Sequence, residues 1–401
     1  MHPKNFQKRK LSNGIIILFE KRDLPVVAFS ISNPFAASHE TSEIKGIAHF
    51  IEHLLYTGTK TRSHEDISRE IEKRGGILNG FTAQDVTSYL FKLPSEHLFS
   101  GVDILIDMIK NPSFAPEKFE KEKKVILEEI KMYHDDPQRN IYDKILENLY
   151  EPPFGSGIIG SEETISTLKR DFVIDYFFQK YSPENFIITI IGNAELDKVC
   201  QFIEKKFNPG GKKIEALKIT KKNSETMEER PGIDQAHFVF AIHAPSAAER
   251  GRYILEVLDA HLANGMSSKL FLEIREKRGL AYAVKSSINM EKNYSYYSIY
   301  VGAEKKAIPE VKKLILEGFN NVIKNMTEKD LQEAKQRLIG LRKISSEESI
   351  NVMNELLFTE IATGNAESYY DYEREINAIT LTQVKALAKI NKYSTAAIVP
   401  K

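Results

Sequence analysis

The sequence predicts an α+β fold built from two similar domains, each a mainly antiparallel sheet packed with helices. The chain has 401 residues, more than one hydrophobic core usually serves, so at least two domains are expected. Strand-like runs and amphipathic helices occur together in both halves, and the order of these elements starts again in the second half. These observations favour domains at 1–208 and 234–401, joined by a linker at 209–233.

Strands in the first half are expected where β-branched and aromatic residues form short runs bounded by turn residues. These runs cover 14–20, 25–32, 77–81, 86–93 and 185–191. Helices are expected where apolar residues recur at three- and four-residue spacing. They cover 44–56, 63–73, 95–110, 116–134, 138–150, 165–180 and 196–207.

The linker is expected because Asn208-Pro209-Gly210-Gly211 opens a run rich in Lys, Glu and Ser that ends at Pro231-Gly232. The strands expected after it cover 237–243, 280–290 and 295–301, and the helices cover 250–262, 267–275 and long segments near the carboxyl end. Glu72-Lys-Arg-Gly75 recurs as Glu276-Lys-Arg-Gly279, each time between a helix and a strand. Lys/Glu-rich helices also resemble one another by composition alone, but the matching order of elements favours a duplication.

Composition excludes several classes of protein. Hydrophobic residues make up 42% and charged residues 28%, with 56 Lys+Arg against 56 Asp+Glu, so bulk charge indicates neither nucleic acid nor an anionic membrane as a partner. No apolar stretch reaches the roughly 20 residues of a membrane-spanning helix, and the polar amino terminus does not resemble a secretory signal. The single cysteine, Cys200, excludes an internal disulfide and a thiolate metal site. A cytoplasmic location is expected.

The segment His49-Phe50-Ile51-Glu52-His53 carries the main chemical signal. Histidines at i and i+4 lie on one helix face, so both imidazoles can bind one ion, and Glu52 projects close to the same point. Neutral imidazoles suit Zn²⁺, and a free carboxylate beside the metal can take a proton from water. The alternative is a pair of histidines that merely flank a buried helix face. The pattern is the zincin motif in reverse order.

A catalytic zinc normally has three protein ligands, so a third residue is required. The helix expected at 116–134 carries several glutamates: Glu120, Glu122, Glu128 and Glu129. Glu122 and Glu129 are two turns apart and share a face. Charge-rich helices are usually only solvated, and composition does not choose among these glutamates.

His49-x-x-Glu52-His53, followed by Glu129 within Glu122-Lys-Lys-Val-Ile-Leu-Glu-Glu129, resembles the pitrilysin, insulysin and mitochondrial processing peptidase family of zinc metallopeptidases, the inverzincins. The resemblance runs over nearly the whole chain. It implies one zinc per chain, held by His49, His53 and Glu129, with Glu52 as the base and Glu122 supporting a ligand. It also implies that the two domains form one half-shell of a peptidase chamber, as in the short members of about 400 residues.

The family also uses an arginine and a tyrosine seven residues apart in the half-shell that faces the zinc. Arg275 and Tyr282 have this spacing, so the resemblance implies a homodimer in which each zinc site is completed by the other chain's pair. The expected substrate is an extended peptide that adds as a strand along 77–82, with Asn79, Gly80, Phe81 and Thr82 as its contacts. The expected activity is therefore zinc-dependent endopeptidase activity. Two alternatives are a non-catalytic homologue with a structural or binding role, and the catalytic subunit of a heterodimeric processing peptidase.

Overall fold

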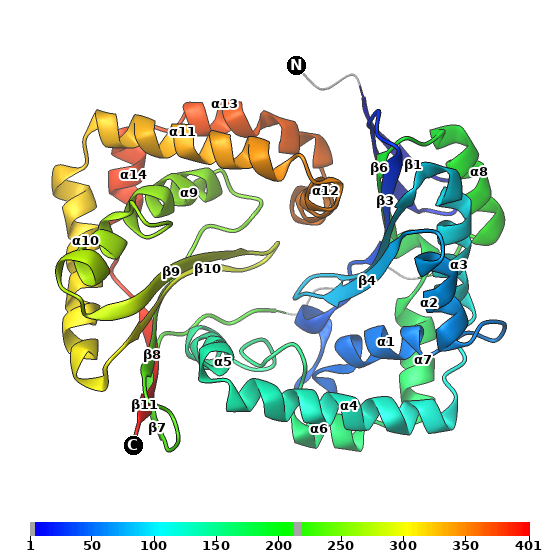
Figure 1. Ribbon diagram of the computed structural model, residues 1–401, viewed down its shortest axis with the longest axis horizontal. Helices are drawn as coiled ribbons and strands as arrows, with labels where there is room; N and C mark the ends of the chain where they lie inside the picture. Colours follow the sequence, from blue (N-terminus) through cyan, green and yellow to red (C-terminus); the bar gives the residue numbers. More distant parts are fainter. Residues whose placement is uncertain (1–4, 212–217) are drawn as a thin grey trace. The chain divides into compact units, whose positions relative to one another are not determined.

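The computed structural model describes residues 5–211 and 218–401, which form two compact units (Figure 1). Among the described residues, the first unit contains 5–131, 157–211, 218 and 345–370. The second unit contains residues 132–156, 219–344 and 371–401. The chain therefore passes between the two units several times, and each unit has its own sheet.

The first unit is built on a six-stranded sheet in the order β1-β2-β6-β3-β5-β4. Its strands are β1 (Phe6–Lys10), β2 (Ile16–Lys21), β3 (Val26–Asn33), β4 (Ile77–Thr82), β5 (Thr87–Pro94) and β6 (Ile187–Gly192). Its helices are α1 (Ile47–Tyr56), α2 (His64–Glu72), α3 (Leu98–Lys110), α4 (Pro116–Asp135), α6 (Glu162–Thr167), α7 (Arg170–Lys180), α8 (Leu196–Lys206) and α12 (Ser349–Thr363). Only the pairing of β2 with β6 is parallel.

The second unit is built on a five-stranded sheet in the order β7-β11-β8-β10-β9. Its strands are β7 (Glu225–Arg230), β8 (Ala236–His243), β9 (Ala281–Met290), β10 (Ser295–Ala303) and β11 (Ser394–Pro400). Its helices are α5 (Pro137–Leu149), α9 (Gly251–Leu262), the π-helix η5 (Phe271–Lys277), α10 (Ile308–Asn325), α11 (Glu328–Ser345), α13 (Tyr372–Asn377) and α14 (Leu381–Leu387). Only the pairing of β7 with β11 is parallel.

The two sheets share one topology. If β2, β3, β4, β5 and β6 are matched in chain order with β7, β8, β9, β10 and β11, both the spatial order and the one parallel pairing coincide, and β1 is an extra strand at the edge. The Glu-Lys-Arg-Gly pairs also match, since one follows α2 before β4 and the other ends η5 before β9. The predicted fold class, α+β with two similar sheets, is confirmed.

Each sheet is covered on its second face by a helix from the other half of the sequence. Strand β6 is buried at all six positions, so both faces of the first sheet need an apolar cover. On one face of this sheet, α1, α3 and α7 contribute to the core. Helix α12 covers the other face. Its apolar side chains pack against those of β2, β3 and β6, and the residues in contact are Val352, Met353, Leu356 and Leu357 with Leu18, Ala28, Ile187 and Ile191. In the second unit, α5 packs its Ile141, Ile145 and Leu149 against Val239, Ala241 and Ile398.

The packing of α5 and α12 differs from the predicted domain boundaries. The ranges 1–208 and 234–401 assign α5 to the first domain and α12 to the second, whereas each of these helices packs in the opposite unit. The predicted linker at 209–233 also contains β7, which pairs with β11, while 212–217 lies outside the described residues. Strand β7 has a polar sequence without the alternation that indicates a strand, and its backbone hydrogen bonds with β11 define it as one.

The helix predicted at 165–180 is divided into α6 and α7, because Leu168 and Lys169 have extended backbones. In the described ranges 5–211 and 218–401, every helix is too short or too polar to span a lipid bilayer.

Candidate metal centre

The helix that carries the histidine motif, α1, begins at a buried carboxylate. Glu40 accepts hydrogen bonds from the backbone amides of Gly46 and Ala48, at 3.0 and 2.7 Å. The Nζ of Lys45 lies 3.6 Å from Oε2 of Glu40, and both side chains are buried. Gly46 has a φ of 95°, and a Cβ there would lie 2.6 Å from the carbonyl oxygen of Ile159. These contacts set where α1 starts and therefore the direction in which its side chains point.

His49, His53 and Glu129 come together between α1 and α4 of the first unit. The Nε2 atoms of His49 and His53 lie 3.8 and 3.7 Å from Oε2 of Glu129. One ligand atom from each residue lies within 4.8 Å of the other two. His49 is buried, while His53 and Glu129 are half-buried. The two histidines lie one turn apart on α1, and Glu129 projects from α4.

These three residues fit a zinc ion. Ligand atoms about 2.1 Å from a tetrahedral zinc lie about 3.4 Å from one another, so a shift of a few tenths of an ångström brings each histidine to that distance from Glu129. The set of two imidazole nitrogens and one carboxylate oxygen is one that zinc binds in catalytic sites. Among the described residues, the ion-pair partners of Glu129 are these two imidazoles.

Burial affects the two histidines differently. Desolvation, together with the neighbouring His53, lowers the pKa of His49 to about 4, so His49 is neutral and able to bind a metal at neutral pH. Burial also lowers the pKa of His53, but the carboxylates of Glu122, Glu52 and Glu129 outweigh burial and raise this pKa above its ordinary value. The carboxylates of Glu52, Glu122 and Glu129 thus concentrate negative charge around His53. A bound cation would balance this charge in place of a proton on the ring.

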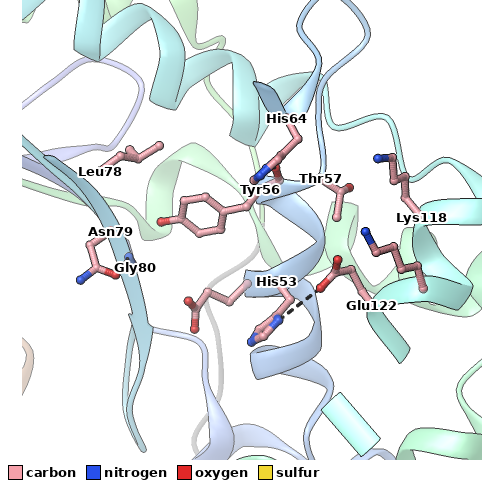
Figure 2. A pocket seen from close by; sticks show the side chains of 11 residues that line it. His53, Tyr56, Thr57, His64, Leu78, Asn79, Gly80, Lys118 and Glu122 are labelled. Carbon is pink, nitrogen blue, oxygen red and sulfur yellow. Dashed lines mark hydrogen bonds and ion pairs between the residues drawn. The ribbon is translucent and has the colours of Figure 1, made fainter. Parts of the chain in front are cut away.

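Glu122 orients His53. Its Oε2 lies 3.4 Å from Nδ1 of His53 (Figure 2), whereas Glu129 approaches Nε2 of the same ring at 3.7 Å. A carboxylate in this place selects the tautomer with hydrogen on Nδ1 and leaves Nε2 free to bind a metal. The supporting role of Glu122 stays a prediction, and its contact with His53 is the geometry that such a role requires.

Glu52 is held apart from the three ligands. Its Oε2 accepts a hydrogen bond from the Thr82 hydroxyl at 2.8 Å, and a Cβ at Gly80 would lie 3.1 Å from its Oε1. Burial raises the pKa of Glu52 above its ordinary value, while the bond from Thr82 and the nearby His53 oppose the increase. A raised pKa makes this carboxylate a better proton acceptor, which is the property of a general base.

Strand β4 forms the wall of the site opposite α4. It is an edge strand, because its one pairing is with β5. Asn79 and Gly80 line a cavity beside Glu52, and Thr82 binds Glu52 directly. Phe81 points the other way and packs against Phe358 of α12. Of the four residues expected to contact the substrate, Gly80 and Thr82 therefore face Glu52, whereas Asn79 lies on the same strand face as Phe81 and points away from Glu52 (Figure 2).

Arg275 and Tyr282 belong to the second unit. Arg275 lies in η5, stacks over the Phe271 ring at 4.9 Å, and keeps 44% of its side chain exposed. Tyr282 lies on the edge strand β9, is 44% exposed, and places its hydroxyl 3.3 Å from that of Tyr300. Both residues are thus available at the surface of their own unit.

The described residues of the second unit contain no matching group of metal ligands. Within residues 5–211 and 218–401, His49, His53 and Glu129 are the one group of three potential ligands that meets at a point. In the repeat, α9 takes the place of α1 and carries His261 without a second histidine. Lys118 and Lys121 beside the site were missed by sequence reasoning, although their spacing from Glu122 on the same helix could have indicated them.

Comparisons with known proteins agree with this geometry. The family described as "Insulinase (Peptidase family M16)" matches residues 36–162, and the one described as "Peptidase M16 inactive domain" matches residues 167–338. The first range contains all the candidate metal ligands. The second range covers most of the unit that lacks them.

The chain is 30% identical over 396 residues to an uncharacterized zinc protease of Bacillus subtilis, with 97% of each chain covered. It is 31% identical over 372 residues to an uncharacterized zinc protease of Mycobacterium leprae, with 90% of this chain and 83% of the relative covered. A protease from Helicobacter pylori has the same fold, with a TM-score of 0.91, 19% identity and full coverage of both chains. A peptidase M16 inactive domain from Pseudomonas fluorescens gives a TM-score of 0.90 at 19% identity, covering 99% of this chain and 98% of its own. This chain belongs to the insulinase family of peptidases, family M16.

Proposed function

We propose that the protein is a zinc-dependent endopeptidase that hydrolyses extended or unfolded peptides. The observation that carries this proposal is the meeting of His49, His53 and Glu129 at one point, with the separate carboxylate of Glu52 beside them. A non-catalytic homologue would have no need for this complete set. The names of the relatives, zinc proteases, agree with the proposal.

The metal ligands, Glu52 and Glu122 have separate roles in the proposed hydrolysis. A zinc ion held by His49, His53 and Glu129 would supply Lewis-acid chemistry, lowering the pKa of water toward about 7 and polarising a peptide carbonyl. Glu52 takes the proton of the attacking water at Oε1, since Oε2 is engaged with Thr82. The same carboxyl then delivers this proton to the amide nitrogen of the leaving peptide. Glu122 holds the hydrogen of His53 on Nδ1 and so directs Nε2 toward the metal.

The open edge of β4 suits an extended substrate. Backbone N–H and C=O groups on the side of β4 away from β5 are free to pair with a peptide as a further strand. Such pairing involves only the backbone of the peptide, so the protein would accept peptides of many sequences, provided that they are unfolded. Gly80 is required because a side chain there would meet Glu52 and the Tyr56 hydroxyl, which would lie 2.5 Å from its Cβ.

Removal of the metal tests the proposal. The purified protein should hydrolyse a mixed pool of unstructured peptides, lose this activity in 1,10-phenanthroline, and regain it when about one equivalent of Zn²⁺ per chain is added back. Peptide products are measured by mass spectrometry and zinc by atomic absorption. Retention of activity in the metal-free protein, or no hydrolysis by the fully zinc-loaded protein, would contradict the proposal.

We further propose that the working form is a homodimer in the cytoplasm, in which Arg275 and Tyr282 of one chain act on the substrate bound at the zinc site of the other. What supports this is the exposure of both side chains, together with the presence of a full set of residues in one chain. In this arrangement the arginine and tyrosine would donate hydrogen bonds to the substrate carbonyl or to the developing oxyanion. A heterodimer with a different partner chain is the competing arrangement.

Mixing of two defective chains tests the homodimer. Chains with Glu52→Gln and chains with Tyr282→Phe, co-expressed with different tags and purified through both, should form hybrids with one intact site, and about a quarter to a half of wild-type activity is expected. Chains with Glu52→Gln and Glu129→Gln, treated in the same way, should stay inactive because both changes affect the same half of the site. No recovery in the first mixture, or a monomeric native mass, would exclude sites shared between two copies.

A further inference from the structure

A cavity of about 410 Å³ lies beside Glu52 in the first unit (Figure 2). Its walls come from α1, α2, β4 and α4, with His64 as the contribution of α2, and Glu52 is itself part of the lining. Figure 2 shows the Tyr56 ring reaching from α1 toward β4, with Lys118 on the opposite side. Because the cavity opens next to the proton acceptor, it is placed to receive a substrate side chain close to the bond that is cut.

Two lysines and two glutamates supply the charged groups of the cavity wall. Both glutamates that line the cavity are engaged, Glu122 with His53 at 3.4 Å and Glu52 with Thr82 at 2.8 Å. Lys118 and Lys121, one turn apart on α4, also line the cavity, and neither has an ion-pair partner in the part of the chain that the structure describes. The two ammonium groups are therefore the lining charges without a hydrogen-bonded or ion-paired partner among the described residues, although Glu65 of α2 interacts electrostatically with Lys118.

The remaining lining suits a short side chain with a charged end. Leu78 of β4 and the Tyr56 ring offer apolar surface to methylene groups, while the ammonium groups stand on the α4 side. Lys118 is half-buried, which reduces screening by solvent and strengthens its attraction for an anion. A lysine or arginine side chain that reached the α4 side of the cavity would meet the like charges of Lys118 and Lys121.

We propose that this cavity is a specificity site for an acidic residue, in which the carboxylate of a substrate Asp or Glu next to the scissile bond is bound by Lys118 and Lys121. The inference rests on the proposed peptidase function and gives it a substrate preference. Backbone pairing along β4 leaves most positions of the peptide unselected, and this position is the exception. The chain then selects extended peptides with an acidic residue at one position.

A positional set of peptides tests the preference. Fluorogenic peptides of one parent sequence carry Glu, Gln or Lys at one of the positions flanking the scissile bond, with cleavage sites mapped by mass spectrometry. At one position the zinc-loaded wild type should cleave the Glu peptide about tenfold faster in kcat/KM than the Gln peptide, and the Lys peptide more slowly still. Amidation of the carboxyl terminus should leave this order unchanged; if amidation abolishes it, the cavity binds the terminal carboxylate of the peptide and the side-chain assignment is overturned.

Charge reversal connects the preference with the two lysines. In K118E/K121E the Lys peptide should be preferred over the Glu peptide, and in the milder K118Q/K121Q variant the ratio of Glu to Gln peptides should fall to about one. The matched control, K124E/K131E, changes the same net charge at exposed positions of α4 outside the cavity and should keep the wild-type ratio.

The outcomes separate this proposal from the peptidase function. Equal kcat/KM for Glu and Gln peptides at every position of an active wild type would overturn the specificity site alone. Loss of the preference for the Glu peptide in K124E/K131E would show that this preference arises from the overall electrostatic field of α4 and not from the cavity. A zinc-loaded wild type that cleaves none of the peptides would instead contradict the peptidase function itself.

Discussion

Replacement of Glu52 by Gln is expected to reduce peptide hydrolysis by about 10²–10⁴-fold while the zinc content stays at one ion per chain. The amide keeps the hydrogen bond with Thr82 and nearly the same volume, but it cannot take a proton from water. Because Glu52 is not one of the three converging ligands, the metal should stay in place. Zinc content and kcat are measured on the same preparation.

Glu120→Gln is the matched control for this variant, since Glu120 is exposed on α4 and does not line the cavity. It should keep wild-type activity. Loss of zinc in Glu52→Gln would make Glu52 part of the metal site, and full activity with zinc bound would remove Glu52 from the proton transfer.

Replacement of Glu129 by Gln is expected to weaken zinc binding by more than about 100-fold and to abolish activity as the metal is lost. Glu129 supplies the one negative charge among the three ligands, because the other two ligands are imidazoles. A neutral amide oxygen in its place is a poorer ligand for Zn²⁺. Competition with a chromogenic chelator gives the change in affinity.

The neighbouring Glu128 offers a close control, since its side chain is 74% exposed and pairs with Lys131 at the surface. Glu128→Gln should bind zinc as the wild type does. A Glu129→Gln protein with full zinc occupancy and normal kcat would show that another group completes the site.

The local part of the site follows from the sequence. Two histidines at i and i+4 on a helix must share a face, so the direction of His49 and His53 is a property of α1 alone. The apolar spacing that predicts a helix at 44–56 is the same spacing that buries the opposite face of α1 in the core. The resemblance to the inverzincins supplied Glu129 and Glu122, which composition could not choose among the glutamates of α4.

The strands with polar sequences were harder to predict. Both β1 and β7 lie at sheet edges and have mostly exposed or half-exposed side chains, so neither shows the alternation that indicates a strand. Their backbone pairings, with β2 and β11, are what make them strands.

The sequence by itself determined the fold class, the repeat of one unit and the metal-binding face of α1, because periodicity and helix geometry act over a few residues. Only the tertiary structure decided which sheet each helix covers, and therefore that α5 and α12 exchange units, since an amphipathic helix can pack on any apolar face. It also decided that Glu129 meets both histidines and that Lys118 and Lys121 face the cavity. These positions depend on how α4 docks against α1, and contacts between residues about 70 positions apart are not encoded in either helix alone.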